Sequence, residues 1–184
     1  MRKEVRFAGF GGQGVIKAAL LTAMAAGLND EVEVAQTQSY GPEARGGACK
    51  SDVVINDGEI DYVKALDIDH FLVMSQPAMD RYASELDLSK AVIIADGTLV
   101  KSAPEEAAKV YYVDATARAE QDFGRALFAN IIMLGALAAI SKVVKLEDLS
   151  TILDGNVPPK TLETNRQALR LGYELGEEAL VKQA

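Results

Sequence analysis

Short apolar runs alternate with segments of helical periodicity along most of the chain. Residues 5–9, 70–74, 91–95 and 110–113 are apolar runs of strand length, and residues 15–26 are apolar on almost every side of a helix. Short buried strands separated by helices are typical of an α/β fold with a largely parallel sheet. We therefore predict a three-layer, Rossmann-like sandwich.

Other segments modify this picture. Residues 31–35 alternate between polar and apolar positions, and residues 51–55 form a second strand-like run, so the region from 31 to 56 resembles a hairpin. The pattern therefore allows a mixed sheet. Further helices are predicted at the following ranges: 78–86, 121–142, 146–153 and 160–182. Without an internal repeat or a long linker, residues 1–184 are predicted to form a single domain.

Composition and charge exclude several classes of protein. The chain has 184 residues and a net charge of -8, without a basic stripe, whereas a protein that neutralises nucleic-acid phosphates needs clustered cations. Its most apolar stretch, residues 126–140, is shorter than the ~20 residues of a membrane span and contains Asn130. No signal peptide is recognisable. We therefore expect a cytoplasmic protein that binds neither nucleic acid nor membrane.

The chain has one cysteine, Cys49, and one histidine, His70. A structural zinc site needs about four ligands and an iron–sulfur cluster typically four cysteines. We therefore expect no metal or redox centre on this chain alone. Cys49 is predicted to be a packed thiol beside a glycine loop, and His70 to begin a strand without a catalytic role.

A glycine loop follows the first predicted strand. Gly9-x-Gly11-x-x-Gly14 has the spacing of a dinucleotide fingerprint between a strand and a helix. Three interpretations remain open at this point: a glycine turn that lets the helix pack on the sheet, a contact with an anion or cofactor, and a site for NAD or FAD. Residues 35–38 contain no acid that would bind a ribose, and the doubled glycine at Gly11-Gly12 favours a tight turn or close packing.

A second loop is richer than an ordinary turn. In Tyr40-Gly41-Pro42-Glu43-Ala44-Arg45-Gly46-Gly47, two glycines follow an arginine, so the backbone can lie close to another surface. The guanidinium of Arg45 could make a bidentate contact with a phosphate or a carboxylate. The alternative is a surface ion pair with Glu43 or another acid.

Together the two loops form a specific combination. Gly-x-Gly-Gly-Gln-Gly followed about thirty residues later by Tyr-Gly-Pro-Glu-Ala-Arg-Gly-Gly resembles the gamma subunit, or the equivalent fused domain, of the 2-oxoacid:ferredoxin oxidoreductases. The likeness covers nearly the whole chain. It continues through Ser51-Asp52, Ser75-Gln76-Pro77, Asp96-Gly97-Thr98, Asn130, Gly135, residues 157–165 and Gly172.

The resemblance implies a function within an assembly. Members of the family decarboxylate a 2-oxoacid on thiamine diphosphate, pass electrons through iron–sulfur clusters to ferredoxin and form an acyl-CoA. It implies that alpha, beta and delta-type subunits carry those cofactors, and that this chain is a non-catalytic component on the coenzyme A side. We predict no catalytic residue here. The candidate coenzyme A contacts are Gly11, Gly12, Gln13, Gly14 and Arg45, since a helix N-terminus and an arginine supply donors to anions.

Other readings of the sequence remain. A stand-alone nucleotide-dependent enzyme and an interaction module without a ligand are the alternatives to the subunit. The isolated chain is expected to be inactive and to self-associate, because a component of an assembly leaves apolar surface uncovered when alone. Asp96 is interpreted as a turn residue, and Asn130 as the partner of a buried loop carbonyl. The choice among 2-oxoacids stays open.

Overall fold

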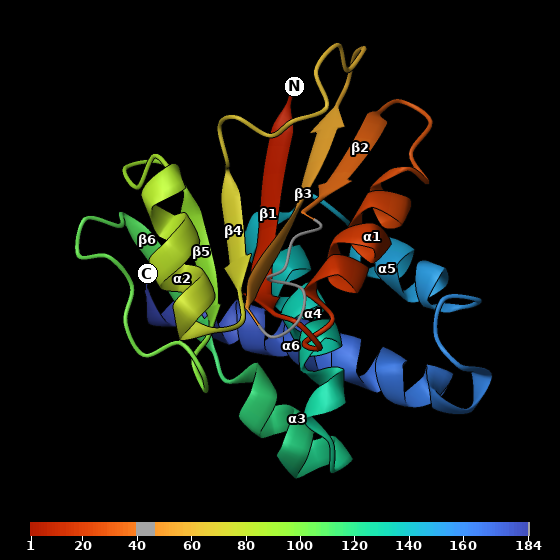
Figure 1. The fold of residues 1–184 in the computed structure, drawn as a ribbon. Helices are drawn as coiled ribbons and strands as arrows, with labels where there is room; N and C mark the ends of the chain where they lie inside the picture. Colours follow the sequence, from red (N-terminus) through yellow and green to blue (C-terminus); the bar gives the residue numbers. More distant parts are fainter. Residues whose placement is uncertain (40–46, 184) are drawn as a thin grey trace.

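The computed structural model describes residues 1–39 and 47–183. Six strands form one sheet in the order β2-β3-β1-β4-β5-β6 (Figure 1). Their bounds are β1 (Lys3–Phe10), β2 (Glu33–Gln38), β3 (Ala48–Asn56), β4 (His70–Val73), β5 (Val92–Asp96) and β6 (Lys109–Val113). The α-helices are α1 (Val15–Ala26), α2 (Gln76–Tyr82), α3 (Ala115–Phe123), α4 (Ala129–Ser141), α5 (Leu146–Leu153) and α6 (Leu162–Lys182). Short 3₁₀ turns are η2 (Ala83–Glu85), η3 (Ala126–Phe128) and η4 (Pro159–Thr161).

The sheet is mixed. Strands β1, β4, β5 and β6 pair in parallel, whereas β3 is antiparallel to both β1 and β2. The predicted α/β class and the hairpin-like region are therefore confirmed. The carboxyl ends of four parallel strands meet at one edge, where ligands gather in open α/β sheets.

Two separate apolar cores lie on the two faces of the sheet. Alternate residues of a strand point to opposite faces, so in β4 Leu72 belongs to one core and Phe71 to the other. The larger core contains side chains of α1, α4, α5 and α6, while α2 covers the other face (Figure 1). The predicted three layers follow from this division.

Helix α4 is buried on every side. Its closest neighbour is α6, and the two helices approach through glycines. A Cβ on Gly172 would overlap the carbonyl group of Ile132, and one on Gly135 would overlap the carbonyl oxygen of Leu169. Because the obstacles are backbone atoms, neither position can accept a side chain without separating the helices.

The helix predicted over residues 121–142 is wrong in its first part. Helix α3 ends at Gly124, which adopts a left-handed conformation with φ 72°, and its N–H donates to the carbonyl of Glu120. Arg125 is extended, and α4 begins only at Ala129. A glycine in this conformation is a common helix end. The break turns η3 back across the carboxyl edge of the sheet.

A buried ion pair crosses β1 and β3 on the α2 face. The guanidinium of Arg6 makes two hydrogen bonds to the Asp52 carboxylate, at 2.8 and 2.9 Å, and a third to Glu85 at 2.6 Å. Burial opposes the charged form, but the hydrogen bonds and charges of Asp52 and Glu85 outweigh it, so the pKa of Arg6 is raised. Asp52 therefore stabilises the pairing of β1 with β3.

We expect Gly172→Ala to lower the free energy of unfolding by at least about 3 kcal/mol, or to prevent folding, because the added methyl group collides with backbone. Gly27→Ala is the matched control. Gly27 has φ -72°, and its Cβ would meet only ordinary contacts from 3.4 Å outward. It should change stability by less than about 0.5 kcal/mol. Urea titration of both variants checks this, and equal midpoints would contradict it.

His70 gives a second prediction. The pKa of His70 is lowered to about 4, mainly because burial disfavours the charged imidazole. The carboxylate of Asp69 raises this pKa and the ammonium group of Lys3 lowers it, but both effects are smaller than that of burial. Between pH 6.5 and 4 the unfolded chain binds the extra proton, so stability falls as the pH falls through this window, by up to about 3 kcal/mol. His70→Leu removes the only histidine and should flatten this part of the profile. An unchanged slope between pH 7 and 4 in urea titrations would contradict it.

Candidate functional site

The glycine loop turns sharply between β1 and α1. Gly12 has φ 102° and Gly14 has φ 77°, both in the left-handed region that glycine favours. The N–H of Gln13 donates to the carbonyl of Phe10 at 3.2 Å and closes the turn. Gly14 is the N-cap of α1 and offers no side chain to the first amides of the helix. The glycines therefore form a tight turn, in agreement with the first of the three interpretations of this loop.

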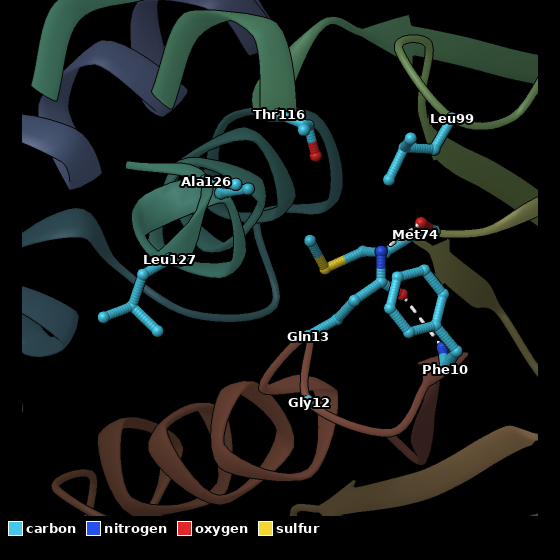
Figure 2. A pocket seen from close by; sticks show the side chains of 9 residues that line it. Phe10, Gly12, Gln13, Met74, Leu99, Thr116, Ala126 and Leu127 are labelled. Carbon is cyan, nitrogen blue, oxygen red and sulfur yellow. Dashed lines mark hydrogen bonds between the residues drawn. The ribbon is translucent and has the colours of Figure 1, made fainter. Parts of the chain in front are cut away.

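Gln13 links this turn to the neighbouring strand. Its Oε1 accepts from the N–H of Phe10 at 2.9 Å, and its Nε2 donates to the carbonyl of Met74 at 2.7 Å (Figure 2). Met74 directly follows β4. One amide side chain thus holds the ends of two parallel strands at a fixed distance.

Asn130 holds the other side of the loop. Its Nδ2 donates to the carbonyl oxygen of Gly14 at 3.3 Å, as predicted from its place in an apolar helix. A Cβ on Gly14 would lie 2.5 Å from this nitrogen. The loop and the first turn of α4 are therefore fitted closely together.

Between these elements lies a cavity of about 420 Å³. Figure 2 shows Phe10 and Met74 on one side and Leu127 and Ala126 of η3 on another. Phe10 is 41% exposed and Leu127 68% exposed, so apolar groups reach solvent at the cavity. Its lining consists of Phe10, Gly12, Gln13, Met74, Leu99, Thr116, Ala126, Leu127 and Ala129. The size is within the range of small-molecule sites.

Asp96 organises the far wall. Its carboxylate accepts from the N–H of Thr98 at 3.1 Å and from the hydroxyl of Thr116 at 2.5 Å. Burial raises the pKa of the Asp96 carboxyl, and the hydrogen bonds from Thr116 and Thr98 oppose that shift. Asp96 is therefore the turn residue that was predicted, and it fixes Thr116 at the cavity.

A second cavity of about 260 Å³ lies next to the first and shares Leu127 with it. Three cations line it, Lys17, Arg125 and Lys160, and no carboxylate is among its lining residues. All three are exposed. In a chain of net charge -8, these three side chains make the surface beside the apolar cavity locally positive, which favours the approach of an anion.

The predicted site residues meet different outcomes. Gly12 and Gln13 line the first cavity, whereas Gly11 and Gly14 belong to the same loop without lining it. Arg45 lies outside the described residues. The sequence reasoning missed the cavity's apolar walls and its neighbouring cations, Phe10, Met74, Leu99, Leu127, Lys17, Arg125 and Lys160. Two features of the sequence could have indicated them. One is Phe10, an apolar residue within the glycine loop, and the other is Lys160, a cation directly after Pro158-Pro159.

Cys49 and His70 lie away from this cavity. Cys49 is 4% exposed and stands opposite Gly9 in the β1–β3 register, and burial raises the pKa of its thiol. His70 begins β4, as predicted. In the described part of the chain, no group of three or more His, Cys, Asp or Glu residues could hold a metal ion. Nor is any helix there both long and apolar enough to span a bilayer.

The fold and these cavities define an α/β protein with a ligand-sized apolar cavity beside a cluster of three cations, at the carboxyl ends of its parallel strands. The chain belongs to the pyruvate ferredoxin/flavodoxin oxidoreductase family, whose pattern matches residues 4–175.

Relatives agree over almost the full length. The chain is 42% identical to the 2-oxoglutarate synthase subunit KorC of Methanocaldococcus jannaschii, covering 97% of this chain and 96% of that one. It is 32% identical to the pyruvate synthase subunit PorC of Methanothermobacter marburgensis, covering 93% and 96%. The solved gamma subunit of a keto/oxoacid ferredoxin oxidoreductase from Geobacter sulfurreducens superposes with a TM-score of 0.85 at 36% identity, covering 97% and 98%.

The Gln13 bridge yields a prediction about the loop. Gln13→Glu keeps an acceptor for the N–H of Phe10 but replaces the donor to the Met74 carbonyl by an oxygen anion. We expect a loss of about 1–3 kcal/mol in the free energy of unfolding at pH 7. The loss should shrink near pH 4, because a protonated carboxyl can donate again. Urea titrations at both pH values measure it, with Gln167→Glu at an exposed position of α6 as the control.

A loss that is equal for Gln13→Glu and for Gln167→Glu, or that does not depend on pH, would show that Gln13 does not hold the two strand ends together.

Proposed function

We propose that this chain is the gamma-type component of a 2-oxoacid:ferredoxin oxidoreductase that acts on 2-oxoglutarate. Four relatives named as 2-oxoglutarate synthase subunits are 38–42% identical, whereas two named as pyruvate synthase subunits are 31–32% identical. The difference in identity, at similar coverage of this chain, supports the choice of substrate. Residues 1–184 act as one domain of that assembly.

The oxidative chemistry belongs to the partners. The chain's single cysteine does not fit an iron–sulfur cluster, which typically needs four. Alpha, beta and delta-type subunits therefore supply the thiamine diphosphate and the clusters, and ferredoxin takes the electrons through them. This chain carries no step of the electron transfer.

Its own contribution is a binding surface for coenzyme A. Coenzyme A joins a narrow, uncharged arm, with methyl groups and a terminal thiol, to several phosphate groups. The cavity at Gly12, Gln13 and Leu127 suits the arm, and the adjoining cavity with Arg125 and Lys160 suits the phosphates. That the two cavities share Leu127 is the observation that carries the proposal.

The remaining candidates have secondary places in it. Gly11 and Gly14 shape the loop that carries Gln13, and the free amides at the N-terminus of α1 face the same end of the molecule. Arg45 is proposed as a further cation for the coenzyme. Lys17 lines the second cavity and donates to the carbonyl of Asn156 at 2.5 Å.

We expect Arg125→Ala and Lys160→Ala each to raise the KM for coenzyme A about fivefold to tenfold in the reconstituted complex, because each removes a charged contact with phosphate. Ferredoxin reduction with 2-oxoglutarate is the assay. Raising the salt concentration should weaken the wild type more than the variants. Arg45→Ala is expected to act in the same direction.

Lys182→Ala, which removes an exposed cation at the end of α6, is the matched control and should leave the KM unchanged. Equal KM values for all these variants would refute the coenzyme A surface. A wild-type complex that oxidises pyruvate but not 2-oxoglutarate would refute the substrate.

A further inference from the structure

A long connection joins β3 to β4 at the amino ends of the parallel strands, which is the end of the sheet opposite the cavities. It spans residues 57–69 without helix or strand. Figure 1 places it above the amino end of β1, away from the glycine loop. Connections of this length that lack secondary structure are uncommon in compact domains and are usually functional.

Side chains of β1 hold this connection by its backbone. Glu4 is 3% exposed, and its Oε2 accepts from the N–H groups of Leu66 and Asp67 at 2.6 and 2.7 Å. Arg2 donates to the carbonyl oxygens of Tyr62 and Lys64 at 3.1 and 3.0 Å, and also binds Glu4. A buried carboxylate is therefore committed to the shape of an external loop.

Two other residues fix the earlier part. Glu33 of β2 accepts from the N–H of Ile60 at 2.8 Å, and Asn56 donates to the carbonyls of Gly58 and Glu59. The loop backbone is thus held from three neighbouring strands. A surface ordered in advance loses little conformational entropy when it binds.

The ordered loop presents apolar side chains to solvent. Tyr62 is 48% exposed, Val63 50% and Leu66 73%. We call these three residues, with Lys64 and Ala65 between them, the 62–66 surface. Exposed apolar residues grouped on one rigid segment mark interaction sites more often than single exposed ones do.

Acidic residues surround the 62–66 surface. Asp57, Glu59, Asp61 and Asp67 are exposed, and Lys64 is the one cation within residues 57–69. The N-terminal ammonium group pairs with Asp57, so the negative charge comes from Glu59, Asp61 and Asp67. A second copy of this chain would bring the same carboxylates and be repelled. A partner with an apolar groove and basic residues at its rim would be attracted instead.

We propose that the 62–66 surface docks onto another subunit of the oxidoreductase, in an apolar groove rimmed by lysine or arginine. The inference rests on the proposed function, since it takes its partner from that assembly. Tyr62 and Leu66 fill the groove, and the surrounding carboxylates orient the subunits. The arrangement leaves the coenzyme A cavities at the other edge free.

The test uses the chain produced together with its alpha, beta and delta-type partners. Tyr62→Ser combined with Leu66→Ser should weaken assembly about tenfold or more, measured as the Kd by sedimentation velocity. Leu28→Ser combined with Val181→Ser removes two equally exposed apolar side chains elsewhere and should assemble like the wild type. Leu66→Ala is a milder variant, and thermal unfolding of each free chain verifies the fold.

A second measurement addresses the charges. Replacing Glu59, Asp61 and Asp67 by their amides should slow association and reduce its salt dependence, while dissociation changes little. An unaltered salt dependence would show that the rim of the partner is not basic and would overturn that part of the proposal.

The outcomes separate this inference from the proposed function. Normal assembly of the Tyr62 and Leu66 variant overturns the docking surface while the subunit assignment stands. Failure of the wild type to assemble with these partners overturns both. Loss of self-association by the free variant, with normal assembly, shows that the surface binds a second copy and overturns the proposed occupant.

Discussion

The close approach of α4 and α6 determines where everything at the carboxyl edge lies. Gly135 and Gly172 let the backbones of α4 and α6 come into contact, so α4 lies within the core that covers one face of the sheet. Its first turn then brings Asn130 to the carbonyl of Gly14, and the preceding turn η3 brings Leu127 over the end of the glycine loop. A wider spacing of the two helices would move one wall of the cavity away from the other.

The opposite wall depends on short polar contacts between strand ends. Parallel strands leave their last backbone groups without partners in the sheet, and buried groups of this kind need hydrogen bonds. Gln13 satisfies two of them between β1 and β4. Asp96 at the end of β5 accepts from the N–H groups of Thr98 in the following turn and of Thr116 in the first turn of α3. The cavity is therefore bordered by side chains that already serve the fold, and it exists before any ligand arrives.

Charge is distributed unevenly between the two ends of the parallel strands. The chain is acidic overall, yet the cavity beside Leu127 has three cations and no lining carboxylate. At the opposite edge the loop between β3 and β4 carries mostly carboxylates around apolar side chains. In the proposed assembly, this separation keeps a polyanionic ligand and a basic partner from competing for one surface.

The fold class, most of the helices and strands, and the family could be predicted from the amino-acid sequence alone. Strand and helix periodicity is a local property, and α1 and α5 begin and end where the pattern predicts. The glycine loop was also recognisable, because only glycine accepts its backbone angles at low cost. Local propensity failed at residues 124–128, where a continuous helix was expected: the left-handed Gly124 ends α3, and packing of η3 against the core outweighs helical propensity.

Only the tertiary structure decided which residues share a site. Leu127, Lys17 and Lys160 lie far apart in sequence, and no local pattern brings them together. Likewise, Glu4 is a charged residue near the start of β1, yet it is buried and its carboxylate accepts from the N–H groups of residues 66 and 67. Such contacts arise when strands pair and helices cross, so they depend on long-range packing that a single sequence encodes only as a whole.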